Sequence, residues 1–184
     1  TGSCMFNPAG GLVGVNTGGS TISNSQAHGT IIGGSRTWAG GLVGQNGFFV
    51  PEDAYGTITN SWATGNVTVA GNQSAAGGLV GSNVWGSEIS GSYHQTGTIT
   101  GSGGATVGGL VGENHGTITT SHARGAVTLA MTGATDGVAG GFVGQNHGSI
   151  SGSDATGAVS STNGDVTLGG FAGFNAGSIV NSFA

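Results

Sequence analysis

One short glycine-rich motif recurs through the chain and restricts the available folds more than any other feature. The motif reads GG(L/F)(V/A)GxN and occurs six times in 184 residues. Its copies begin at Gly10, Gly40, Gly77, Gly108, Gly140 and Gly169. The intervals between these starts are 30, 37, 31, 32 and 29 residues. A motif at a nearly constant period is typical of a repeat architecture, in which each unit packs against its sequence neighbours.

Each copy of the motif is followed by a second set of regularly placed residues. An Ile follows the motif Asn in every copy, and a Ser always comes three residues after that Ile. The residues are Ile22, Ile58, Ile89, Ile118, Ile150 and Ile179, with Ser25, Ser61, Ser92, Ser121, Ser153 and Ser182. A segment AxGx(V/I) comes next in most copies, and copy three carries one extra residue there, within residues 94–99.

These patterns predict an all-β fold. Every unit contains three short β-prone pieces separated by Gly, Asn and Ser, which are turn residues. A helix is not expected, because no 11-residue window shows a 3.6-residue period and Gly interrupts every candidate. We therefore expect a β-solenoid of about six stacked coils, with three short strands per coil. The coils start near the six motif glycines and form a single domain over residues 1–184.

Stacking places equivalent residues of successive coils above one another, about 4.8 Å apart. We expect the Ile and Val columns, together with Leu or Phe of the motif, to fill a narrow core. The Asn column should lie at a turn, take the left-handed conformation, and bond its side-chain amide to the next coil. The motif glycines should permit a tight corner or a close approach of backbone segments.

Composition argues against several classes of partner. The chain holds 43 Gly, but its recurring Ile, Val and Thr and its scarcity of charge differ from the composition of disordered segments. Lys is absent, and Arg36 and Arg124 are the only Arg residues. Without clustered cations the chain is not expected to bind nucleic acid or an anionic membrane surface. No apolar run reaches the roughly 18 residues of a membrane span.

The combined pattern GGLVGxNxGxIxxSxAxGxV resembles the GLUG repeat. This repeat is found in large secreted bacterial surface proteins, including filamentous-haemagglutinin-like adhesins and the non-catalytic regions of some immunoglobulin A peptidases. The resemblance covers nearly the whole chain and all six copies. It implies a secreted, extracellular β-solenoid at the cell surface or in a matrix, and it implies no fixed activity.

The two ends of the sequence match when they are joined. Ser182-Phe183-Ala184 followed by Thr1-Gly2-Ser3-Cys4 reproduces the pattern of residues 61–67, with Cys4 in the position of Val67. Neither end has the polar outer face of a capping unit. We therefore expect self-association through Thr1, Gly2, Cys4, Ser182, Phe183 and Ala184. Either subunits stack head to tail, or the sequence is cut from a longer tandem-repeat polypeptide; a piece trimmed at arbitrary points is the alternative.

The sequence predicts no catalytic residue, no cofactor and no metal site. Neither a GxSxG elbow nor an HExxH helix occurs. Cys4 is the only Cys, so an intrachain disulfide and a Cys-based zinc site are excluded; a buried apolar Cys and an interchain disulfide both stay open. His115 and His147 should lie about 5 Å apart in adjacent coils as a solvated pair. Calcium at Glu52 and Asp53 is an alternative.

Aromatic residues provide the candidate ligand-binding surface. If Ser and Ala of the SxA segment face inward, the residue between them faces outward. That column contains Gln26, Trp62, Tyr93, His122, Asp154 and Phe183. Trp62, Tyr93 and His122 would form a stacked exposed strip suited to sugar rings, with Phe48, Phe49 and Trp85 as further contacts. The alternative is that these rings pack against the lateral face or against neighbouring loops.

The sequence thus predicts a structural or adhesive fibre segment, not an enzyme, whose main partner is another copy of itself. The alternative is a carbohydrate-binding adhesin segment for a surface polysaccharide. Two further alternatives are a non-catalytic region of a large secreted peptidase and an ice-binding face. The ice-binding face would use paired Thr and Ser beside the Ile column, namely Thr21/Ser23, Thr57/Thr59, Thr117/Thr119 and Ser149/Ser151.

Overall fold

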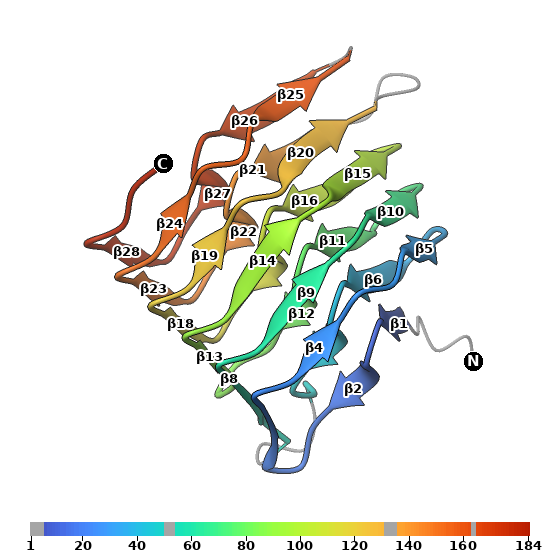
Figure 1. Cartoon of the computed structure of the whole chain (residues 1–184). Helices are drawn as coiled ribbons and strands as arrows, with labels where there is room; N and C mark the ends of the chain where they lie inside the picture. Colours follow the sequence, from blue (N-terminus) through green and yellow to red (C-terminus); the bar gives the residue numbers. More distant parts are fainter. Residues whose placement is uncertain (1–5, 50–53, 131–135, 163–164) are drawn as a thin grey trace.

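The protein is seen here as a computed structural model that describes residues 6–49, 54–130, 136–162 and 165–184. Throughout these residues the structure consists of short strands and turns, with no helix. All strand pairs are parallel, and they form five sheets that run along one axis in sequence order (Figure 1). The expected all-β solenoid is therefore confirmed.

The five sheets are named by their place in each coil. The entry sheet ends on the first motif Gly and contains β1 (Asn7–Gly10), β6 (Thr37–Gly40), β11 (Ala75–Gly77), β16 (Thr106–Gly108), β21 (Gly137–Gly140) and β26 (Val166–Gly169). The motif sheet contains β2 (Val13–Asn16), β7 (Val43–Asn46), β12 (Val80–Asn83), β17 (Val111–Asn114), β22 (Val143–Asn146) and β27 (Ala172–Asn175).

The remaining three sheets follow the motif Asn. The isoleucine sheet contains β3 (Ser20–Ser23), β8 (Gly56–Thr59), β13 (Glu88–Ser90), β18 (Thr117–Thr119), β23 (Ser149–Ser151) and β28 (Ser178–Val180). The serine–alanine sheet contains β4 (Gln26–Ala27), β9 (Trp62–Thr64), β14 (Tyr93–Thr96), β19 (His122–Ala123) and β24 (Asp154–Ala155). The valine sheet contains β5 (Ile31–Gly33), β10 (Val67–Ala70), β15 (Thr98–Ser102), β20 (Ala126–Leu129) and β25 (Val159–Ser161).

Each complete coil therefore carries five short strands, one in each sheet. Five complete coils are followed by β26, β27 and β28 of a sixth. The three β-prone pieces expected in each unit are divided more finely, because the motif glycines make a corner between the entry and motif strands. A second break between strands falls just before the repeated Ser. There the chain turns from the isoleucine sheet into the serine–alanine sheet.

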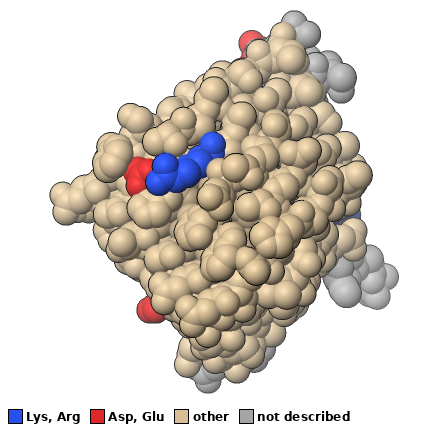
Figure 2. Space-filling view, viewed as in Figure 1, with Lys and Arg blue, Asp and Glu red and all other residues tan. Residues whose placement is uncertain are grey.

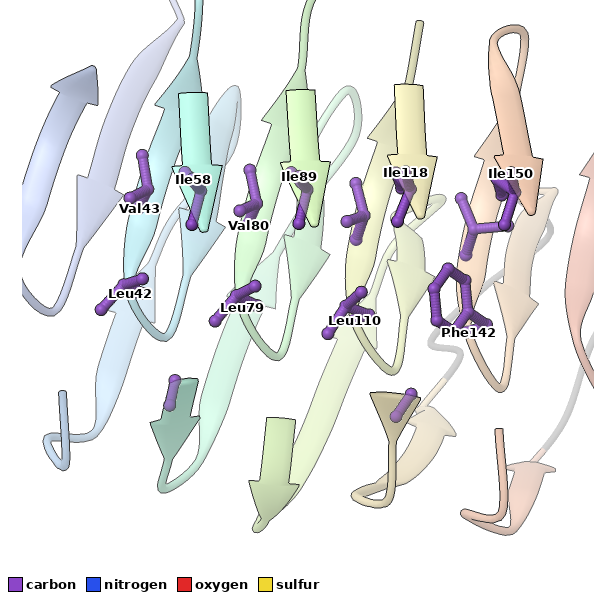
Figure 3. Close-up of a cluster of buried hydrophobic side chains, with 14 of the residues drawn as sticks. Leu42, Val43, Ile58, Leu79, Val80, Ile89, Leu110, Ile118, Phe142 and Ile150 are labelled. Carbon is purple, nitrogen blue, oxygen red and sulfur yellow. The ribbon is translucent and has the colours of Figure 1, made fainter. Parts of the chain in front are cut away.

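The interior is filled by the expected columns. One core cluster joins the motif, isoleucine and serine–alanine sheets, and Figure 3 shows its Leu, Val, Ile and Phe side chains repeating from coil to coil. A second cluster joins the entry and valine sheets. Ile58, Leu79 and Val111 are fully buried examples of the three main columns of the first cluster. The parallel register keeps each column aligned, as in Ile58, Ile89 and Ile118.

The motif asparagines form a hydrogen-bonded ladder through the protein. Each side-chain Nδ2 donates to the side-chain Oδ1 of the next Asn, at 2.7–2.9 Å. The column is Asn16, Asn46, Asn83, Asn114, Asn146 and Asn175. The expected bond to the next coil is therefore confirmed. The expected left-handed backbone is wrong, because none of these residues has a positive φ and each one ends a strand of the motif sheet.

The left-handed position lies instead immediately before the repeated Ser. All six residues there have φ between 48° and 57°, namely Asn24, Asn60, Gly91, Thr120, Gly152 and Asn181. The Ser that follows then bonds in two directions. Its hydroxyl donates to the carbonyl two residues earlier, as from Ser92 to Ser90 at 2.8 Å, and accepts the N–H of the previous coil's Ser, as from Ser61 at 3.1 Å. These two hydrogen bonds of the Ser hydroxyl explain why the spacing between Ile and Ser never varies.

The first two motif glycines are required by space. A Cβ on the first Gly would lie 1.8–2.0 Å from the carbonyl oxygen of the fourth motif residue in every copy. A Cβ on the second Gly would lie 1.9–2.3 Å from a backbone carbonyl oxygen of the next coil wherever a full coil follows. Both distances are far inside van der Waals contact, so any larger residue would force the backbone apart. The expected tight corner and close approach are both present.

Copy three departs from the repeat through a β-bulge. The register against β9 shifts between His94 and Thr96, so the extra residue of this copy is Gln95. His94 takes the inward place that Ala63 and Ala123 occupy in the neighbouring coils, and it is fully buried. Its Nε2 lies 3.2 Å from the Gly65 carbonyl oxygen, while its Nδ1 has no partner. Burial lowers the pKa of His94, which keeps this imidazole neutral.

The Asn ladder gives the first prediction. Replacing Asn83, at the middle of the ladder, with Ala leaves the Nδ2 of Asn46 and the Oδ1 of Asn114 without their 2.9 and 2.8 Å partners. We expect Asn83→Ala to lower the free energy of unfolding by about 3 kcal/mol, because a buried unpaired polar group costs about 1–3 kcal/mol. Urea titration followed by circular dichroism measures the change. Asn175→Ala, at the exposed end of the ladder, is the control and should cost clearly less; equal losses at both positions would contradict the prediction.

The left-handed column gives the second prediction. Thr120 is the only β-branched residue among the six, at a φ of 48° that Asn and Gly tolerate better. We expect Thr120→Asn to raise the free energy of unfolding by about 1 kcal/mol. The reverse substitution at the equivalent position of another coil, Asn60→Thr, should lower it by a similar amount. Urea midpoints that shift in neither variant would show that the left-handed backbone carries no cost here.

Candidate functional site

The column predicted between the repeated Ser and Ala residues is present on the outer face of the serine–alanine sheet. Its register runs from Gln26 through Trp62, Tyr93, His122 and Asp154 to Phe183. The serines and alanines beside it are buried in the inner coils. The column therefore faces outward as the alternation of a strand requires, and Trp62, Tyr93, His122 and Asp154 are each half-buried.

Trp62 and Tyr93 form a stacked pair that bridges two coils. Their ring centroids are 5.7 Å apart and their planes differ by 3°. The sequence predicted a stacked strip of Trp62, Tyr93 and His122; the first two rings are stacked, whereas no ring contact among the described residues joins Tyr93 to His122. The pair therefore acts as one rigid aromatic unit, and such pairs add about 0.5–1.5 kcal/mol beyond the burial of their area.

Polar side chains continue the column beyond Tyr93. His122 Nδ1 pairs with the Oδ1 of Asp154 in the next coil. A shallow hollow lies beside this pair and is lined by Tyr93, Gln95, His122 and Arg124. Figure 2 shows basic and acidic side chains next to each other on this face, within a surface that is otherwise nearly free of charge. Among the described residues, the hollow thus combines an aromatic ring, an amide, an imidazole and a guanidinium.

The other predicted ligand-binding residues lie on a separate surface. Phe49, Trp85, His115, His147 and Phe174 form a continuous line of ring contacts beside the corner that follows the motif Asn. Successive centroids are 5.6, 4.6, 4.9 and 5.7 Å apart. We call this line the aromatic–histidine strip. Trp85 in this strip is 61% exposed, and Phe48, at the base of the same loop, is 49% exposed. The predicted set is therefore divided between two surfaces.

The predicted distance between the two histidines of this strip is confirmed, because their rings stack with centroids 4.9 Å apart. Their environments differ, however. His147 is exposed, whereas His115 is half-buried and its Nδ1 has no partner. Burial, followed by the charge of His147, lowers the pKa of His115. Within the described residues no group of three or more His, Cys, Asp or Glu side chains could hold a metal ion.

Sequence reasoning missed the inner end of this strip. Trp38 is buried in β6 and stacks on Phe6, with ring centroids 4.2 Å apart. Its ring centroid lies 5.7 Å from that of Phe49. Its indole approaches the Glu113 carboxyl. The pKa of Glu113 is raised overall, because the effect of burial exceeds the smaller lowering by Trp38. No repeated position signals these contacts, because Phe49 enters through the longest insertion in the chain. The only sequence signal is the clustering of aromatic residues outside the repeat columns.

The paired Ser and Thr columns flank the inward Ile as predicted. Thr21, Thr57, Glu88, Thr117, Ser149 and Ser178 form one column, and Ser23, Thr59, Ser90, Thr119, Ser151 and Val180 form the other. Glu88 is exposed and Val180 is 49% exposed. Both interrupt the hydroxyl array on the surface itself, so the array is continuous over only part of the sheet.

The predicted self-association residues are described in part. Thr1, Gly2 and Cys4 lie outside the described residues, as do Glu52 and Asp53. Ser182, Phe183 and Ala184 extend the serine–alanine sheet, because Ser182 Oγ accepts the Ser153 N–H at 3.2 Å and the Phe183 carbonyl accepts the Ala155 N–H at 3.0 Å. The Phe183 side chain is 66% exposed. A search of the described part of the chain finds no helix long and apolar enough to cross a membrane.

Comparison with known proteins identifies the repeat itself. Residues 9–32 and 39–68 match the family model described as the GLUG motif. No curated protein matches the chain, and neither does any solved structure. The two matched segments cover the first two coils, and the later copies place the same Gly, Asn, Ile and Ser residues in the same columns. Two segments of the chain therefore match the GLUG motif, and in this structure both lie in coils of the β-solenoid.

Proposed function

We propose that this chain is a structural segment of an extracellular fibre, in which further coils of the same kind stack on its two ends. The observation that carries the proposal is the apolar character of both end coils. Leu12 in the first coil is 49% exposed, although its counterparts Leu42 and Leu79 are fully buried. At the other end Leu168 is 43% exposed, although its counterpart Ala139 is fully buried. These side chains complete their columns only when another coil covers them.

The backbone at the two ends supports the same arrangement. The strands of the first coil and those of the last are edge strands of their sheets. Edge strands present unpaired N–H and C=O groups that readily pair with another strand. A further coil of this repeat offers both the matching hydrogen bonds and the matching apolar columns. That coil comes either from the same polypeptide or from a second copy of the chain.

A fibre of this kind works through length and stiffness. Inner coils hold each other by five parallel sheets, by the Asn ladder and by the Ser bonds, so each added coil extends one rigid body. The extracellular location in this proposal comes from the resemblance of the repeat to bacterial surface proteins. No sequence or structural feature described above requires catalysis.

We propose carbohydrate binding as the second function, at the stacked Trp62–Tyr93 pair and the polar residues beside it. The observation in its favour is the preorganised aromatic unit, with its planes 3° apart, next to a hollow lined by hydrogen-bonding side chains. Aromatic rings with neighbouring polar groups suit a sugar, which has both apolar C–H faces and hydroxyl groups. The fibre would then hold this site away from the surface that bears it.

The fibre proposal predicts end-to-end association of the isolated chain. The 17.5 kDa chain should form rods whose mass rises with protein concentration. Leu12→Glu places a carboxylate in the apolar end face and should weaken association more than tenfold, because an unpaired charge is costly to bury. Sedimentation velocity and electron microscopy measure the rods. Thr21→Glu, on the lateral surface of the same coil, is the matched control; a wild type that stays monomeric, or a Leu12→Glu variant that assembles normally, would refute end-to-end stacking.

The carbohydrate proposal predicts a loss of binding when the ring pair is removed. Trp62→Ala and Tyr93→Ala should each lower affinity for a bound oligosaccharide about tenfold, as expected for aromatic residues at the centre of a binding site. A glycan array followed by calorimetry on the strongest hit gives the measurement. Trp85→Ala removes an exposed ring of the aromatic–histidine strip and should leave binding unchanged. If only Trp85→Ala abolishes binding, the sugar site belongs to that other surface.

A further inference from the structure

We infer that the hollow lined by Tyr93, Gln95, His122 and Arg124 binds the carboxylate-bearing ring of an acidic sugar, such as a uronic acid residue. The inference rests on the proposed carbohydrate binding and specifies its ligand class. The hollow belongs to copies three and four, and its side chains come from β14, from β19 and from the turn after β19. It is the place on the serine–alanine sheet where the repeat is least regular.

The β-bulge of copy three adds a polar side chain to this hollow. Gln95 is the residue that the bulge inserts between His94 and Thr96, and its side chain is exposed. Bulges commonly redirect a side chain beside a binding site. His94 holds the bulge to the interior, because its ring is buried and its Nε2 lies 3.2 Å from the Gly65 carbonyl oxygen. The amide of Gln95 offers both a donor and an acceptor, which suits sugar hydroxyl groups.

Arg124 supplies a positive charge to the hollow. The ion pair that the described residues contain joins His122 to Asp154, and none of the carboxylates described forms an ion pair with the Arg124 guanidinium. The side chain is exposed, and its backbone N–H is fixed by a 3.0 Å bond to the His94 carbonyl. A guanidinium binds a carboxylate with two parallel hydrogen bonds. The hollow therefore offers one well-placed partner for a single carboxylate.

Tyr93 supplies the surface for the sugar ring. Trp62 covers one face of Tyr93 at 5.7 Å, and the next coil in the column carries His122. Tyr93 and His122 both line the hollow but make no ring contact with each other within the described residues. A pyranose ring held in the hollow would therefore lie against the Tyr93 side chain, with Arg124 at the same hollow.

The scarcity of cations in this chain argues against a densely charged anionic ligand. The formal net charge is −5, and Arg36 is the only other Lys or Arg residue in the chain. A densely charged ligand such as nucleic acid needs several clustered cations, which this surface does not have. A sugar with one carboxylate per ring matches one guanidinium. A neutral sugar would leave that guanidinium without a partner.

The test compares two oligosaccharides that differ in the carboxylate. Calorimetry measures binding of galacturonic acid oligomers and of galactose oligomers with the same linkage and length. The wild type should bind the acidic oligomer at least tenfold more tightly. Arg124→Gln should remove most of that difference, because the charged bidentate contact is lost. Arg36→Gln changes the net charge equally and should leave the preference unchanged. Thermal unfolding of each variant shows that the coils remain folded.

The outcomes separate the ligand class from the underlying function. Equal binding of both oligomers, weakened by Tyr93→Ala but not by Arg124→Gln, overturns the acidic class and leaves carbohydrate binding at the ring pair in place. An acidic preference that Arg36→Gln and Arg124→Gln reduce equally also overturns the inference, because it would reflect net charge alone. Absence of binding to both oligomers overturns the inference, while the glycan array tests the broader carbohydrate proposal separately.

Discussion

The register of the coils depends on the buried Asn ladder. Each inner Asn donates its amide to the next and accepts from the one before, so the ladder is satisfied only when all six residues stand in line. A slip of one residue would leave buried amides unpaired and would turn the core side chains to the outer face. The spacing between motif starts nevertheless varies from 29 to 37 residues. The extra residues are accommodated in turns and loops because the ladder fixes the strands on both sides.

The repeat itself was enough to predict most of the fold. Identical residues at a regular interval must stack, so the Ile column, the Asn bonds and the outward column from Gln26 to Phe183 could all be predicted before any coordinates. The left-handed position could not be assigned in the same way, because Asn, Gly and Thr share it. The left-handed backbone was assigned to the motif Asn because Asn tolerates that conformation better than most residues. Its buried side-chain bonds to neighbouring coils hold it in a strand instead.

The candidate surfaces were harder to predict because they depend on departures from the repeat. Trp38, Phe49 and Trp85 come from different columns and loops, so periodicity cannot show that their rings meet. The stacking of Trp62 on Tyr93 follows from the register, but the hollow beside them requires the bulge at Gln95. The extra residue was visible in the sequence of copy three. Its consequence for the surface depended on which way the bulge turned the side chains.

Regular and irregular positions therefore have different roles in this protein. The columns shared by all coils provide the stacking, and they leave little room for chemistry because Gly, Asn, Ile and Ser are already committed to it. Among the described residues the site proposed at Tyr93, Gln95, His122 and Arg124 occurs once, where copies three and four differ from the others. In the proposed fibre of stacked chains, that site would recur once per chain length along one face. A polysaccharide could then contact several weak sites at once, and its overall affinity would far exceed that of a single site.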